Sequence, residues 1–245
     1  GVPLSSPSRN EIKISPPPVP LSLYPECASE GCYELCLRNT ALISSLFRHC
    51  VKTASSVVVE VTPRAYMPEQ ASIVLNWYSP KYRDEIATCT LFLSSLGNQY
   101  GLDIDTVQSS LRGENMSEQL INACRKLLMQ ITPTGSGRMI TIEAATGKFF
   151  MGHAIGAYVW ARKNIGFSFL SDASQLRGQF FTWLAKQPLS TEERTFLHKA
   201  AESAETPWQY AELTLADKPV GKAFLLGYKS FVGQVSDQQP CQEIC

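Results

Sequence analysis

The spacing of apolar residues along the chain predicts several helices. Apolar positions that recur every three or four residues are typical of a helix with one buried face. They predict helices from residue 32 to residue 47, over 81–96, 117–130 and 176–187, and again after Ser190. Ser190 and Glu193 have the spacing of a capping box and mark the start of that last helix.

Short runs rich in β-branched and aromatic residues predict strands. They lie at 57–61, 138–144, 148–160, 166–171, 208–215 and 223–235. The order of elements is therefore helices, then an antiparallel sheet, then helices. This order is typical of an α+β fold and differs from the alternating strands and helices of nucleotide-binding folds. The sequence contains neither a G-x-G-x-x-G fingerprint nor a P-loop.

The first 25 residues differ in composition from the rest of the chain. They contain seven of the 15 prolines and show little apolar periodicity. Proline fixes the backbone in extended conformations and cannot donate a backbone hydrogen bond. We therefore expect residues 1–25 to form an extended arm and residues 26–245 to form one domain.

Charge and hydropathy limit the classes of partner. Lys and Arg number 22, and Asp and Glu also number 22, so no net charge attracts the chain to nucleic acid or to anionic lipid. No apolar stretch reaches the roughly 18 residues that a membrane-spanning helix needs. We expect no nucleic-acid partner and no transmembrane segment.

Half of the eight cysteines lie between residues 27 and 50. Cys89 and Cys124 lie in apolar segments predicted to be helical, where a free thiol packs as a small apolar side chain. This usage is typical of a protein in a reduced compartment. Zinc is an alternative, and its ligands would be Cys27, Cys32, Cys36 and either His49 or Cys50. The spacing departs from the paired ligands of most structural zinc sites.

Cys32 is the best-placed candidate nucleophile. It follows Gly31 at the first turn of a predicted helix, where free N–H groups and the helix dipole favour a thiolate. Cys36 lies one turn further on, where packing is the better interpretation, and Cys27 lies outside the helix. We assign the nucleophile to Cys32, with a buried structural thiol as the alternative.

His153 is the candidate general base, and Asp172 is its candidate partner. The strand that begins at His153 is predicted to form a hairpin with 166–171, which would bring His153 opposite residues 173–175. The carboxylate of Asp172 would then orient the imidazole and stabilise its charged form. Alternatively, Asp172 caps the helix that follows it, and His153 is an ordinary strand histidine.

These residues resemble the YopT/AvrPphB-like cysteine proteases. The likeness lies in Gly31-Cys32 at the start of a helix, in the segment 152–159, in 169–172 and in the later Gly-Gln-Phe of 178–180. The resemblance implies a papain-like fold with a triad of Cys32, His153 and Asp172. It also implies a secreted bacterial effector that is delivered into the host cytoplasm and acts on a host protein.

Such a triad would perform acyl transfer, and we expect neither a cofactor nor a metal. The Cys32 thiolate would attack a carbonyl carbon, and His153 would pass the proton to the leaving amine. With a peptide and water the reaction is proteolysis, whereas with a glutamine side chain it is deamidation or transglutamination. A non-catalytic binding or adaptor protein is a further alternative, and it predicts a buried and unreactive Cys32.

Overall fold

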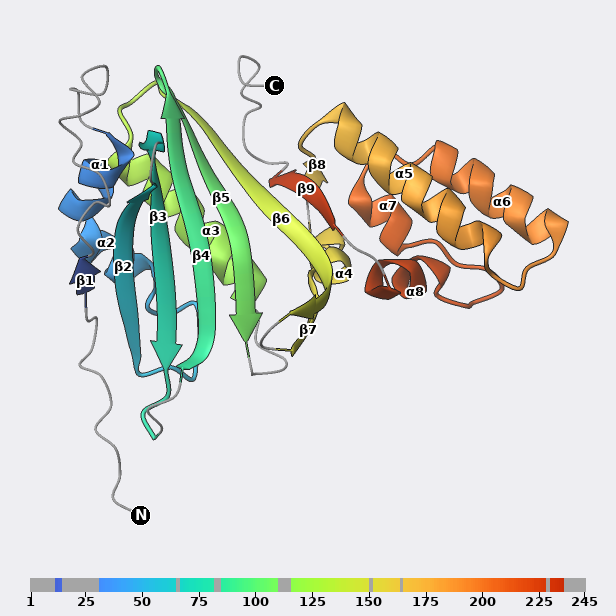
Figure 1. The fold of residues 1–245 in the computed structure, drawn as a ribbon, viewed down its shortest axis with the longest axis horizontal. Helices are drawn as coiled ribbons and strands as arrows, with labels where there is room; N and C mark the ends of the chain where they lie inside the picture. Colours follow the sequence, from blue (N-terminus) through green and yellow to red (C-terminus); the bar gives the residue numbers. More distant parts are fainter. Residues whose placement is uncertain are drawn as a thin grey trace. The chain divides into compact units, whose positions relative to one another are not determined.

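The computed structural model describes residues 12–14, 31–64, 67–81, 85–109, 116–149, 152–163, 165–227 and 230–235. Within these ranges the chain is a mixed α+β protein, as predicted (Figure 1). It divides into two compact units: the first unit extends to Ile140, and the second unit begins at Thr141. This boundary lies inside the domain predicted for 26–245. Of the predicted arm, only Ile12–Ile14 lie among the described residues.

A sheet of long antiparallel strands forms the centre of the first unit (Figure 1). Its strands are β2 (Ser56–Arg64), β3 (Met67–Tyr78), β4 (Glu85–Leu96) and β5 (Gln99–Ser109). They pair in the order of the sequence, and the short β1 (Ile12–Ile14) pairs with β2 in parallel. Gly97, with a φ of +61°, provides the left-handed residue of the tight turn between β4 and β5.

Three helices cover the sheet of the first unit: α1 (Cys32–Arg38), α2 (Thr40–Phe47) and α3 (Met116–Ile131). α1 packs mainly on β3 and α2 on β2, while α3 packs beside α2 and on β5. Buried and partly exposed residues alternate along β4 and along residues 71–78 of β3, and Val59, Leu75 and Cys89 are fully buried neighbours on adjacent strands. The buried Trp77 Nε1 donates to the Phe47 carbonyl oxygen at 2.9 Å, which fixes the end of α2 to the sheet.

The segment 81–96 contains strand β4, so the helix predicted there is wrong. The residues used for that prediction, among them Ile86, Cys89 and Leu93, do have helical spacing. However, the buried residues occupy every second position from Ala87 to Leu93, as in a strand. Cys89 and Leu93 fit both periods, and pairing with β3 and β5 decides in favour of the strand. Those two neighbouring strands were not predicted either.

Other expectations for the first unit are confirmed. The helix predicted over 117–130 is α3, and the one predicted from residue 32 to residue 47 is α1 and α2, separated at Asn39. The strand predicted at 57–61 lies within β2. The helical segments have apolar residues at helical spacing, and 57–61 is a run of β-branched residues.

The second unit combines short strands with a group of helices (Figure 1). β6 (Gly137–Phe149) starts in the first unit and, within the second, pairs with β7 (Gly152–Ile155) and β9 (Ser230–Val235). β9 also pairs with β8 (Ile165–Phe167). The helices are α4 (Gly156–Ala161), α5 (Leu170–Ala185), α6 (Thr191–Glu202), α7 (Pro207–Ala211) and α8 (Val220–Gly227). None of the described helices has the length and apolar character that a membrane span requires.

Aromatic side chains form the core between the helices of the second unit. The ring of Phe180 on α5 lies 5.0 Å from that of Phe224 on α8 and 5.9 Å from that of Tyr210 on α7, both edge to face. A Cβ at Gly221 would collide with the carbonyl oxygen of Tyr210. The close approach of α7 and α8 therefore requires glycine at position 221.

Four predicted strands of the second unit are wrong or too long. The segment 148–160 leaves the strand conformation after Ile155 and continues as α4, and 166–171 is a strand only to Phe167. The strand predicted at 208–215 is largely helix α7, and the one at 223–235 begins within α8. Short apolar runs have no unique period, so neighbouring elements decide their conformation.

The helical expectations of the second unit are confirmed. The helix predicted over 176–187 is most of α5. The Glu193 N–H donates to Ser190 Oγ at 3.1 Å, and the Ser190 N–H donates to Glu193 Oε1 at 2.9 Å. The predicted capping box therefore starts α6. The strand predicted at 138–144 is part of β6.

Candidate functional site

Cys32 occupies the predicted position at the start of a helix. Gly31, with extended backbone angles, precedes α1, and its carbonyl oxygen accepts the Leu35 N–H at 3.1 Å. The Cys32 side chain is only 1% exposed, however, and its Sγ donates to Ser95 Oγ at 3.5 Å. In the described conformation the thiol therefore faces the protein interior instead of a substrate.

The surroundings of Cys32 favour the neutral thiol. Burial is the main cause, and it raises the pKa of Cys32 because a thiolate would lose its hydration. The hydrogen bond with Ser95 opposes this shift, whereas the carboxylates of Glu69 and Glu34 add to it. Desolvation thus outweighs the stabilisation that we expected from the start of the helix.

His153 lies on β7, opposite Lys148 of β6. The hairpin predicted between the strand of His153 and 166–171 is wrong, because β7 pairs with β6, α4 follows it, and β8 pairs with β9. The register that was expected to bring residues 173–175 opposite His153 is therefore absent. His153 itself remains on a strand, as predicted.

Asp172 is held by two backbone groups. Its Oδ2 accepts the N–H of Phe169 at 3.1 Å, and its Oδ1 accepts the N–H of Val232 at 3.3 Å. The first contact satisfies a free donor at the start of α5, and the second joins that end of the helix to β9. Asp172 therefore stabilises the start of a helix, as in the capping alternative, but it does so from inside the first turn of α5, which begins at Leu170. Cys32 lies in the first unit and His153 and Asp172 in the second, so the triad stays a prediction.

Replacing Asp172 is expected to destabilise the second unit. Asp172→Ala removes both acceptors and should lower the free energy of unfolding by about 1–3 kcal/mol, because helix-start N–H groups lose a charged partner. Ser174→Ala, an exposed position on the same helix, should change it by less than about 0.5 kcal/mol. Urea unfolding followed by tryptophan fluorescence measures this, since three of the four tryptophans lie in the second unit. Equal stability of the two variants would show that the Asp172 contacts contribute nothing.

The cysteines of the first unit form part of its core. Cys36, Cys50, Cys89 and Cys124 are buried free thiols. Burial raises the pKa of each, that of Cys50 to about 12. Among the residues described by the structure, no group of three or more His, Cys, Asp or Glu residues could hold a metal ion. Cys27, one of the proposed zinc ligands, lies outside the described residues.

The first unit contains a crossover that the sequence patterns did not reveal. α3 connects the end of β5 to the start of β6, and these strands are neighbours in the sheet. The Gly137 N–H, at the start of β6, donates to the carbonyl oxygen of Asn98 at 3.0 Å, directly before β5. Both strands thus start at the same edge and run in the same direction (Figure 1). Pairing therefore changes from antiparallel to parallel at β5.

The amino end of α3 follows the carboxyl end of β5. The connection between Ser109 and Met116 has the sequence Ser-Leu-Arg-Gly-Glu-Asn, and its residues lie outside those described. An Arg-Gly pair is only a weak local signal, and it points to this connection only when β5 is recognised as a strand.

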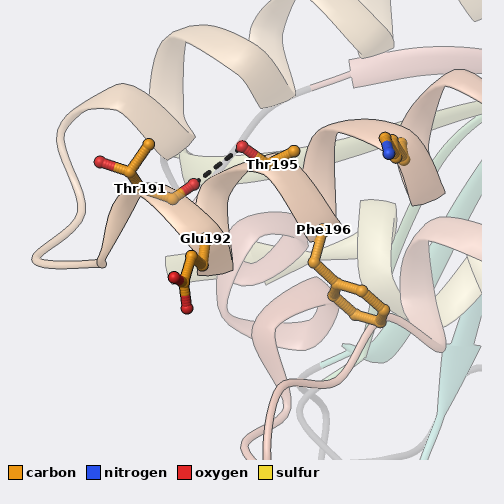
Figure 2. Close-up of a pocket in the computed structure, with 5 residues that line it drawn as sticks. Thr191, Glu192, Thr195 and Phe196 are labelled. Atoms are coloured by element: carbon orange, nitrogen blue, oxygen red, sulfur yellow. Dashed lines mark hydrogen bonds between the residues drawn. The ribbon is translucent and has the colours of Figure 1, made fainter.

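A shallow pocket lies on the exposed side of α6 (Figure 2). It has a volume of about 370 Å³ and is lined by Thr191, Glu192, Thr195, Phe196 and Lys199. The hydroxyl of Thr195 donates to the carbonyl oxygen of Thr191 at 2.9 Å, so it is engaged within the helix. All five residues come from one helix, and they include no cysteine or histidine. The pocket does not resemble the site of an acyl-transfer reaction.

No family model matches this chain, and no curated protein matches it either. The papain-like fold, the effector function and the delivery into a host cell therefore stay predictions that follow from the resemblance.

Proposed function

We propose that the first unit binds a ligand with a phosphate or pyrophosphate group at the amino end of α3. The supporting observation is the crossover from β5 through α3 to β6. It adds a parallel strand pair to a sheet whose strands β2–β5 are antiparallel. A helix that connects two parallel strands starts near the carboxyl end of the first strand, and in open α/β sheets ligands bind beyond the carboxyl ends of the strands.

The amino end of α3 has the properties of an anion site. The first turn of a helix has N–H groups without partners in the helix, and its dipole attracts negative charge. α3 is 16 residues long, so its dipole is fully developed, and its buried face fixes it in the first unit. Phosphate groups bind at such helix ends in many nucleotide-binding proteins.

The residues that lead into α3 fit this ligand. The six residues before α3 include Arg112, whose guanidinium can donate two hydrogen bonds to phosphate oxygens, and Glu114, whose charge opposes an anion. Glu118 is the acidic residue in the first turn of α3, and its negative charge opposes the binding of an anion there.

Isothermal titration with ADP and with coenzyme A tests this proposal, because both molecules contain a pyrophosphate. We expect both to bind and adenosine not to bind. Arg112→Ala should weaken binding at least about tenfold, since a charged hydrogen-bonding partner is lost. Lys126→Ala makes the same change of charge on the exposed face of α3, far from its amino end, and should have little effect. No binding of either pyrophosphate at millimolar concentration would contradict the proposal, as would equal losses in the two variants.

A second candidate is cysteine-dependent acyl transfer on a protein substrate. Its support is the position of Cys32 directly after Gly31 at the start of α1. In the described conformation, the burial of Cys32 and its raised pKa oppose this function. We therefore place it after phosphate-ligand binding.

A further inference from the structure

In the second unit, two cationic side chains approach the ring of one tyrosine. The guanidinium carbon of Arg162 lies 5.4 Å from the ring centroid of Tyr158, and Lys222 Nζ lies 5.4 Å from the same centroid. Tyr158 belongs to α4, Arg162 follows α4 directly, and Lys222 belongs to α8. α4 and α8 pack against each other, so the fold brings both cations to the ring of Tyr158.

These two positive charges have no acidic partner in the described part of the chain. Both side chains are exposed, and the ring of Tyr158 is the one partner that the structure gives to their charged groups. Each cation is attracted by the ring, but the cations repel each other. An anion that contacts both cations would offset this repulsion.

We propose that Arg162 and Lys222, held by the ring of Tyr158, bind a phosphate group. A phosphate monoester has a charge close to −2 at neutral pH, which matches the two cations better than a single carboxylate does. The guanidinium can donate two parallel hydrogen bonds, and the ammonium adds a compact charge. The group could belong to a free phosphorylated molecule or to a phosphorylated side chain of another protein.

This proposal does not depend on the one for the amino end of α3, because its residues belong to the second unit. Binding should therefore be measured both in the unmodified chain and in Arg112→Ala. If Arg162 and Lys222 bind a phosphate group, the Arg112→Ala variant still binds phosphate in the second unit. The failure of either proposal can then be recognised without reference to the other.

The probes are inorganic phosphate, a phosphoserine peptide and its unphosphorylated copy, titrated at low ionic strength. In the Arg112→Ala chain we expect the phosphopeptide to bind, and Arg162→Gln and Lys222→Gln each to weaken it at least about fivefold. Tyr158→Phe keeps the ring and should bind normally, whereas Tyr158→Ala should bind more weakly. Lys199→Gln removes an exposed cation from α6 and serves as the matched control.

The outcomes distinguish a free phosphorylated molecule from a phosphorylated protein, and they test the proposal. Binding of inorganic phosphate at a similar strength indicates a free phosphorylated molecule, and binding of the peptide alone indicates a protein partner. The proposal is overturned if neither probe binds at millimolar concentration. Equal binding of the unphosphorylated peptide would overturn it too, as would an equal loss in Lys199→Gln, because either would indicate unspecific attraction.

Discussion

Cys32 is expected to react with iodoacetamide at pH 7.5 at least about tenfold more slowly in the folded protein than in urea. Alkylation requires the thiolate and access to the sulfur, and the folded chain restricts both. The side chain is 1% exposed, and burial raises its pKa, so few molecules hold a thiolate at this pH. The rate should rise with pH as the thiolate forms. Mass spectrometry with assignment of each labelled cysteine measures these rates.

Two variants test the causes of the slow reaction. Ser95→Ala removes the hydrogen bond that lowers the pKa of Cys32, so alkylation of Cys32 at a fixed pH should become slower still. Glu69→Gln removes a negative charge that raises this pKa, so alkylation should become faster.

The opposite result would support the predicted triad. If Cys32 is the fastest cysteine at neutral pH and His153→Ala slows it, the thiolate is formed with the help of the imidazole. The Cys32–His153–Asp172 hypothesis would then replace phosphate-ligand binding as the leading function. Loss of activity in Cys32→Ala on a protein substrate would be the next test.

The first unit is expected to lose stability steeply above pH 8.5. Its buried thiols have a raised pKa in the folded state, whereas in the unfolded chain they ionise near pH 8.5. Above that pH the unfolded state therefore binds fewer protons than the folded state, and the free energy of unfolding falls as pH rises. The fall approaches about 1.4 kcal/mol per pH unit for each buried thiol. Several thiols together would remove most of the stability of an ordinary domain near pH 10.

Urea unfolding between pH 8 and pH 10 measures this slope. The extent of pulsed alkylation of Cys89, divided at each pH by its extent in the fully unfolded chain, reports the unfolded fraction of the first unit. Cys124→Ala removes one ionisable thiol and should therefore reduce the slope by about 1.4 kcal/mol per pH unit. Leu128→Ala also makes a cavity on the buried face of α3, and should lower stability at every pH without changing the slope. A slope that is the same in Cys124→Ala and the unmodified chain would show that Cys124 ionises equally in both states.

Elements whose side chains interact within a few residues were predictable. The apolar residues of α3, among them Leu120, Cys124 and Leu127, repeat at helical spacing, and all of them are buried. Ser190 and Glu193 form a capping box from side chains three residues apart. In both cases the interactions that stabilise the element lie inside the element.

The candidate site was predictable only at the level of single positions. Cys32 does begin a helix and His153 does lie on a strand, as expected. The Cys32 thiol forms a hydrogen bond with Ser95 of β4, which lies in a segment predicted to be a helix. Asp172 accepts the N–H of Val232, 60 residues away, and no local pattern predicts that contact.

The sequence by itself determined the α+β class, the long amphipathic helix α3 and the start of α6, because these follow from local periodicity and capping. Only the tertiary structure decided that 85–96 is a strand, since Cys89 and Leu93 fit both periods until β3 and β5 pair beside them. It also decided that burial outweighs the helix dipole at Cys32, and that α3 joins two parallel strands. Strand pairing and desolvation both depend on residues far apart in the chain, and the order of residues in one segment does not specify them.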